Sequence, residues 1–330
     1  MNSKKSRERS SRQVDGESPK PKGKRWIRRV LIGLFVFLFV WLASDFGYSR
    51  YVQTQISRWE SNISRDDNGV RLGCDSFTLN NGDRAILFVH GFNETPQIWY
   101  KMAPNLAERG FTCRGLRLPG FGEPIEEYRK SNHEAWLKAI DEEIKSLQEK
   151  HTMIIVVAHS LGGAVTVQQL LQEPGCVDGV VLLAPAIDTA SVRSPFLTTR
   201  FWHEFSKWTL PFSQTAMSPF EYDAKDPKEQ QVKLRNKFSP RSVVNSMYHL
   251  IDENRDRAGE IKTPARFFVS PDDQVVDTAT VKNFYQAWGA ENKSLTELDN
   301  SGHAIPIDFD WKDVADEVEA FANELAEGVR

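Results

Sequence analysis

Residues 153–172 join a strictly apolar run to a cluster of small residues with no spacer between them. Met153 to Ala158 (MIIVVA) contains no polar side chain, which is typical of a strand buried on both faces of a parallel sheet. His159-Ser160-Leu161-Gly162-Gly163 follows directly, and apolar residues then recur with a helical period to Gln172. A buried strand that passes so abruptly into a helix predicts an α/β protein with a mostly parallel sheet and helices on both faces.

The rest of residues 70–330 alternates in the same way. We expect strands at 70–79, 85–90, 111–118, 179–184, 265–269 and 295–298, and helices at 98–109, 136–149, 241–254, 279–288 and 311–325. Asn80-Asn81-Gly82-Asp83 predicts a tight turn, so the first two strands should form a hairpin. The alternation fails from Ile187 to about Ser239, which we interpret as a cap insertion in a single domain of residues 70–330.

The N-terminal segment differs from this body. Residues 1–25 are rich in Ser, Lys, Arg and Pro without an apolar period, so we expect a disordered basic tail. Val30 to Ala43 is entirely apolar or Gly, and Trp26 to Tyr48 reaches the length of a transmembrane anchor. Residues 49–69 are mixed and helical in pattern, and we interpret them as a stalk that acts as a spacer.

Two other interpretations of the apolar segment are a cleaved signal peptide and a buried core helix. Cleavage after Ala43 would place the bulky Trp41 where small residues are needed, and the basic flank disfavours a core helix. An uncleaved single-pass anchor is therefore favoured. Its positive flank should stay in the cytoplasm, which would put the catalytic domain on the extracytoplasmic side.

The charge distribution limits the partners. Residues 1–29 carry 11 Lys/Arg against 3 Asp/Glu, whereas the remaining chain carries 31 against 42. An acidic body gives no reason to expect nucleic acid as a partner. The three cysteines, Cys74, Cys113 and Cys176, lack metal-ligand spacing, and we expect neither a metal nor any other cofactor.

Three residue types suited to nucleophilic catalysis follow predicted strands. Ser160 lies between a strand and a helix, Asp273 follows the strand at 265–269, and His303 follows the strand at 295–298. The carboxyl ends of parallel strands meet at one edge of a sheet, where ligands bind. A serine needs a base to remove its proton and the base needs an oriented tautomer, so Ser160, His303 and Asp273 predict a catalytic triad.

Several stretches carry a family resemblance. Ala158 to Ala164, Val180 to Ala186 and Arg117-Leu118-Pro119-Gly120-Phe121-Gly122 resemble the α/β-hydrolase superfamily, in particular bacterial carboxylesterases and monoacylglycerol lipases, the serine aminopeptidase-like hydrolases. The resemblance covers roughly residues 83–326. It departs from the usual pattern at three places, with Ala158 and Ser270 for Gly and Phe121 for His.

The resemblance implies an activity and further site residues. The loop Ile86 to Phe92 resembles the loop that forms an oxyanion hole, so the backbone N–H groups of Phe92 and Leu161 are the expected donors. Asp273, and not its neighbour Asp272, matches the family spacing of the acid. The implied function is hydrolysis of small carboxylic esters or lipids through an acyl-enzyme on Ser160. Thioesterase, amidase or peptidase activity and a catalytically silent anchored binding protein remain alternatives.

The insertion occupies the position of the family's cap. Its aromatic residues Trp202, Trp208 and Phe212 are candidates for an acyl-binding wall, and ordinary packing of a cap explains them equally well. The sequence predicts neither the natural substrate nor the oligomeric state.

Overall fold

The computed structural model describes residues 23–79, 82–194, 196–218, 221–230 and 234–328. These residues form two compact units that divide between Ser44 and Asp45. The boundary falls within one continuous helix, α1, which spans Gly23–Glu60.

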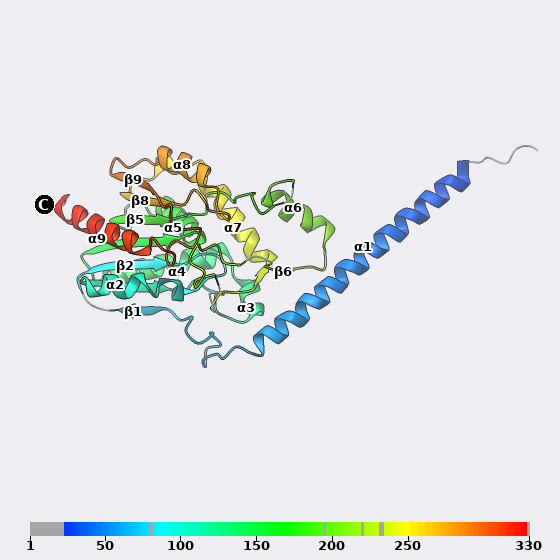
Figure 1. The fold of residues 1–330 in the computed structure, drawn as a ribbon, viewed down its shortest axis with the longest axis horizontal. Helices are drawn as coiled ribbons and strands as arrows, with labels where there is room; N and C mark the ends of the chain where they lie inside the picture. The colour runs from blue at the N-terminus through cyan, green and yellow to red at the C-terminus, as the bar shows by residue number, and fades with distance from the viewer. Residues whose placement is uncertain (1–22, 80–81, 195, 219–220, 231–233, 329–330) are drawn as a thin grey trace, which may run out of the picture. The chain divides into compact units, whose positions relative to one another are not determined.

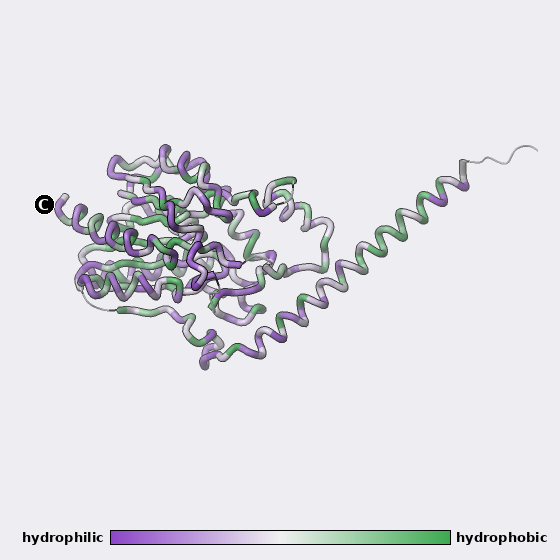
Figure 2. Tube along the Cα trace, in the orientation of Figure 1, coloured by the Kyte–Doolittle hydropathy of each residue, from purple (hydrophilic) through white to green (hydrophobic). Residues whose placement is uncertain are grey.

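The first unit holds the N-terminal part of α1. Side chains from Arg25 to Val40 are exposed, and α1 is long and apolar enough to cross a membrane. Figure 2 shows the hydrophobic residues along this part of the trace. Of the predicted disordered tail, residues 1–22 lie outside the described residues. The prediction was wrong for residues 23–25, which are helical because Lys24 and Arg25 are good helix formers that continue the apolar helix.

The remainder of α1, from Asp45 onward, belongs to the second unit and packs into its core. Val52 and Ile56 are almost fully buried in its core, and the Trp59 ring lies edge-on to Phe238 at a centroid distance of 5.6 Å. Residues 49–60, predicted as part of a spacer, are instead a packed element of the domain. The apolar residues at 52, 56 and 59 repeat at three- and four-residue intervals, which places them on one face of the helix.

A seven-stranded sheet forms the centre of the second unit (Figure 1). Its strand order is β1-β3-β2-β4-β5-β8-β9, and all neighbours except β1 and β3 are parallel. The strands are β1 Phe77–Leu79, β2 Arg84–Val89, β3 Phe111–Leu116, β4 Met153–His159, β5 Gly179–Leu183, β8 Ala265–Val269 and β9 Lys293–Glu297. The mostly parallel sheet predicted from the sequence is confirmed.

The predicted hairpin was wrong. β1 pairs antiparallel with β3, at the edge of the sheet, and β2 lies between β3 and β4. Ala85 to Val89 are fully buried, so this strand requires neighbours on both sides. The three residues of β1 are only partly buried, which suits an edge position.

Helices cover both faces of the sheet. The first face packs against α4 His133–Gln148, α5 Leu161–Gln172, α7 Arg241–Asn254 and α8 Thr278–Ala287, together with residues 52–59 of α1. The second packs against η1 Pro96–Trp99, α2 Met102–Glu108 and α9 Trp311–Gly328. Side chains of the central strands alternate between these two cores, as in Leu87 and Phe88 of β2. Two short helices, α3 Ile125–Lys130 and η2 Ala258–Glu260, lie in the connections.

The predicted insertion between β5 and α7 contains a helix and a small sheet. The helix is α6, Thr199–Thr209, and the antiparallel pair is β6 Thr215–Met217 with β7 Phe238–Pro240. This cap enters the chain after the carboxyl end of β5, on the edge of the sheet where ligands bind in open α/β folds.

Candidate active site

Ser160 lies in the turn between β4 and α5. Its φ of 51° and ψ of −116° fall in a region that residues with a side chain rarely adopt. The close approach of neighbouring chains explains the small residues beside it. A Cβ at Gly162 would lie 2.3 Å from the Val89 carbonyl oxygen, and one at Gly163 would lie 2.7 Å from Pro185 Cβ. The sequence Leu161-Gly162-Gly163 therefore permits a sharp elbow that presents the Ser160 hydroxyl.

The three residues predicted to act together are brought into one hydrogen-bonded chain. His303 Nε2 lies 3.0 Å from Ser160 Oγ, and His303 Nδ1 lies 2.8 Å from Asp273 Oδ2. Asp273 accepts a hydrogen bond from the Nδ1–H group of His303, which leaves Nε2 free to accept the Ser160 proton. All three side chains are nearly excluded from solvent. This is the arrangement that makes a serine hydroxyl nucleophilic.

The Asp273 carboxylate is held on both of its oxygens. Oδ1 accepts the backbone N–H groups of Val275 and Val276, each at 2.8 Å. Burial raises the pKa of Asp273, but the nearby His303 and these two N–H donors outweigh burial, so the pKa lies below its usual value. The carboxylate therefore stays ionised while it orients His303.

The neighbouring carboxylate has a different environment. The Asp272 side chain is 66% exposed and its Oδ2 accepts from Lys225 Nζ at 2.5 Å. The geometry thus favours Asp273 over Asp272 as the partner of His303. Ser270, which replaces the family Gly, donates its hydroxyl to the Ser301 carbonyl oxygen at 2.5 Å and joins the Asp273 loop to the His303 loop.

The charge on His303 depends on two opposing effects. Burial lowers its pKa, whereas the Asp273 carboxylate raises it through charge and a hydrogen bond, and the net pKa lies above 6.5. A base with a raised pKa accepts a proton readily once it is neutral.

Two backbone N–H groups are available near Ser160. A Cβ at Gly91 would lie 3.0 Å from Ser160 Cβ, so the loop after β2 passes against the elbow. The N–H groups of Phe92, in that loop, and Leu161, at the start of α5, donate to no acceptor within the described part of the chain. A helix N-terminus adds a positive partial charge at Leu161. Their role as an oxyanion hole stays a prediction.

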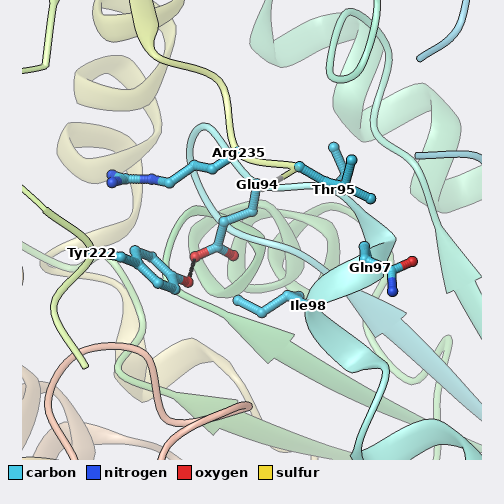
Figure 3. A pocket seen from close by; sticks show the side chains of 7 residues that line it. Glu94, Thr95, Gln97, Ile98, Tyr222 and Arg235 are labelled. Carbon is cyan, nitrogen blue, oxygen red and sulfur yellow. Dashed lines mark hydrogen bonds between the residues drawn. The ribbon is translucent and has the colours of Figure 1, made fainter. Parts of the chain in front are cut away.

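A buried carboxylate behind these loops was missed by the sequence analysis. Glu94 Oε2 accepts from Gly91 N at 2.7 Å and from His159 Nδ1 at 2.9 Å, and Oε1 accepts from the Tyr222 hydroxyl of the cap. Figure 3 shows Glu94 and Tyr222 directed at each other in a small cavity also lined by Arg235. Burial raises the pKa of Glu94, but His159 and Tyr222 outweigh burial and lower it to about 2. The signal available in the sequence was a charged residue two positions after Phe92, at the end of the loop expected to form the oxyanion hole.

His159 connects this carboxylate to the base. Its Nε2 lies 2.9 Å from the His303 carbonyl oxygen, while its Nδ1 faces Glu94. Carboxylate and carbonyl oxygens only accept hydrogen bonds, so both ring nitrogens of His159 carry protons. A buried ion pair therefore links the loop after β2 to the main chain of His303.

The three aromatic residues predicted as an acyl-binding wall lie in the cap. Trp202 and Trp208 belong to α6, a helix with no buried residue, and Trp208 is 88% exposed. Phe212 is 45% exposed and lines a surface cleft with Ser49 and Val52 of α1. Their role as an acyl-binding wall stays a prediction.

The structure combines a mostly parallel sheet with a sharp turn at Ser160 after β4, an acid after β8 and a histidine after β9. This combination defines the α/β-hydrolase class. The chain belongs to one of its families, described as serine aminopeptidase S33, whose profile matches residues 80–310. The loops that carry Ser160, Asp273 and His303 all fall within the matched residues.

Curated relatives and solved structures agree with this assignment. The chain is 25% identical to a thermostable monoacylglycerol lipase of Bacillus sp. (strain H-257), over 73% of this chain and 91% of the relative. It is 24% identical to a carboxylesterase of Bacillus subtilis (strain 168), over 76% and 96%. Its fold is similar to that of a Paleococcus ferrophilus monoacylglycerol lipase, with a TM-score of 0.64 and 18% identity over 76% of this chain and 98% of that chain. The chain is thus a hydrolase similar to esterases and monoacylglycerol lipases.

Proposed function

We propose that the chain is a membrane-anchored serine hydrolase that cleaves carboxylic esters in the manner of a carboxylesterase or monoacylglycerol lipase. The observation that carries the proposal is the hydrogen-bonded chain from Ser160 through His303 to Asp273. Two further observations support it. Two backbone N–H groups beside Ser160 donate to no acceptor among the described residues, and the chain is similar to a monoacylglycerol lipase and a carboxylesterase.

The reaction follows from the positions of these groups. The Ser160 proton passes to His303 Nε2 as Oγ bonds to the ester carbonyl carbon. The carbonyl oxygen becomes negative and accepts hydrogen bonds from the N–H groups of Phe92 and Leu161. Cleavage of the C–O bond releases the alcohol with the proton from His303 and leaves the acyl group on Ser160. A water molecule, deprotonated by His303, then releases the carboxylic acid and restores the serine.

Membrane attachment is the second part of the proposal. The exposed apolar part of α1 supports a single span, and the basic residues before it favour a cytoplasmic N-terminus with the catalytic domain on the other side. Fractionation of cells expressing the full chain tests this part: recovery of the uncleaved chain in the soluble fraction would contradict it.

A fluorophosphonate probe tests the catalytic part. The probe should label the full chain at Ser160, Ser160→Ala should abolish the labelling, and Ser218→Ala, in the cap, should leave it unchanged. Failure of the parent chain to react would favour the catalytically silent alternative. A matched series of esters, thioesters and amides of one acyl group then separates esterase from thioesterase and amidase activity.

A further inference from the structure

Asp223 of the cap contacts the loops of both the acid and the base. Its backbone carbonyl oxygen accepts the Ala304 N–H at 2.9 Å, and its side-chain Oδ2 accepts the Gln274 N–H at 2.8 Å. Ala304 directly follows His303, and Gln274 directly follows Asp273. One residue from a distant part of the chain therefore holds the main chain next to each partner of the hydrogen bond between His303 and Asp273.

The contact with the His303 loop is close. Asp223 is only 9% exposed, and a Cβ added at Gly302 would lie 2.7 Å from the Asp223 carbonyl oxygen. The Gly302 N–H donates at 2.8 Å to the fully buried Asp308, which also accepts the Lys225 N–H of the cap at 2.7 Å. The loop is thus joined to the cap on both sides of His303, and glycine at position 302 leaves room for this approach.

A second cap residue supports the contact with the Asp273 loop. Arg193, in the segment before α6, lies with Nη2 3.4 Å from Asp223 Oδ1, and its Nε donates to Gln274 Oε1 at 3.0 Å. Both carboxylate oxygens of Asp223 are therefore used, one by the main chain of the acid loop and one by the guanidinium that binds the same loop. Two separate segments of the cap meet at Gln274, so a shift of the cap would move the acid loop with it.

We propose that Asp223 is a positioning residue that sets the distance and the angle between His303 and Asp273. The proposal rests on the serine hydrolase function proposed above. His303 and Asp273 lie on loops that follow different strands, and a misplacement of ~1 Å in such a pair can cost about 10² in rate. The hydrogen bond from Ser270 to Ser301 joins these loops before the two residues, and Asp223 joins them immediately after. The cap thereby supports the acid and the base.

The charge of Asp223 also acts on His303. Burial lowers the pKa of His303, Asp273 raises it most, and the carboxylates of Glu94 and Asp223 raise it further. The fourth charged group that faces His303 is the His159 ring, at a centroid distance of 4.8 Å. Removal of the Asp223 charge should lower the pKa of His303, whereas loss of a purely structural contact would leave that pKa unchanged.

Three substitutions in the full chain test the proposal. Asp223→Ala removes the carboxylate, and Asp223→Asn keeps an oxygen for the Gln274 N–H but lacks the charge. Asp226→Asn is the matched control, because the Asp226 carboxylate accepts from Lys228 N at 3.0 Å and contacts neither loop among the described residues. The measurements are the rate of labelling by a fluorophosphonate, kcat and KM for a water-soluble nitrophenyl ester, and the pH dependence of kcat/KM. Circular dichroism confirms that each variant is folded.

Asp223→Ala should lower kcat about 10²-fold and slow the labelling, with little change in KM, because it moves the acid and the base and leaves Ser160 in place. Asp223→Asn should keep more of kcat, and its midpoint of kcat/KM should move to lower pH by less than that of Asp273→Asn. Asp226→Asn should match the parent chain.

Parental kcat in a folded Asp223→Ala would overturn the proposal. An unshifted midpoint in a folded Asp223→Asn would also overturn it, and this result decides the matter if Asp223→Ala does not fold. A parent chain that the fluorophosphonate does not label would instead refute the proposed hydrolase function.

Discussion

The Glu94 carboxylate lies 2.9 Å from Nδ1 of His159, the residue immediately before Ser160, and both side chains are buried. This ion pair holds Gly91 in the loop beside Ser160 and, through His159, the main chain of His303. When one partner of a buried ion pair loses its charge, the charge of the other partner stays buried without compensation.

Glu94→Gln should therefore destabilise the fold by about 3–5 kcal/mol and lower turnover. Tyr222→Phe, which removes one hydrogen bond to the same carboxylate, should cost less, about 1.5–3 kcal/mol. Urea unfolding of both variants measures the difference. The Glu94 carboxylate stabilises the fold fully above its ordinary pKa of 4.5, and this contribution is lost as the pH falls through about 2. An equal free energy of unfolding for Glu94→Gln and the parent at neutral pH would rule out the ion pair.

Replacement of the two adjacent carboxylates should have unequal effects. Asp273→Asn keeps the shape but favours the wrong tautomer of His303, which in a related triad costs on the order of 10⁴ in turnover. Asp272→Asn, the matched control, removes only an exposed contact with Lys225 and should change turnover within a few-fold, about 1 kcal/mol or less. Steady-state kinetics measure the turnover of both variants, and circular dichroism confirms that both are folded. A collapse in Asp272→Asn with near-normal turnover in Asp273→Asn would show that the acid was assigned to the wrong residue.

The raised pKa of His303 should appear in the pH dependence of kcat/KM. His303 must be neutral to accept the Ser160 proton, so activity should rise with pH through a midpoint above 6.5. Protonated His303 paired with Asp273 stabilises the fold below 6.5, and this contribution is lost as the pH rises through the folded pKa. In Asp273→Asn the midpoint of the residual activity should move down, because burial then acts without the opposing carboxylate. An unchanged midpoint would show that Asp273 does not raise the pKa of His303.

Truncation should have a sharp limit within α1. Removal of residues 1–44 leaves Asp45, Val52 and Ile56 in place, so the shortened chain should be soluble and keep its turnover of a water-soluble ester. Removal of residues 1–60 uncovers the core beneath Val52 and Ile56, each worth about 1.5–3 kcal/mol of burial. Thermal unfolding measures the stability of the two shortened chains, and the chain without residues 1–60 should be the less stable. Equal stability of the two would show that residues 49–60 act as the predicted spacer and not as a packed part of the domain.

The sequence predicted those features that depend on local pattern. Met153 to Ala158 could be recognised as a central strand because every side chain is apolar, and the ends of parallel strands converge, so Ser160, Asp273 and His303 could be expected at one edge. Other features depend on contacts distant in the sequence. Nothing local in Phe77–Leu79 distinguishes pairing with β2 from pairing with β3, and the partner of Glu94 lies 65 residues away in the elbow. The packing of Val52 and Ile56 was missed because their helix continues a segment with a different, apolar pattern.

The backbone of Ser160 has a consequence for the evolution of the fold. At a φ of 51° a residue with a Cβ destabilises the folded state by about 1–3 kcal/mol relative to glycine. In regular helices and strands glycine is usually the less stable residue. Ser160→Ala and Ser160→Gly both lack the hydroxyl, so their difference isolates the backbone, and the glycine variant should unfold at the higher urea concentration. Selection for stability alone would therefore favour glycine at this position, and a chain that keeps serine there gives up stability in exchange for reactivity.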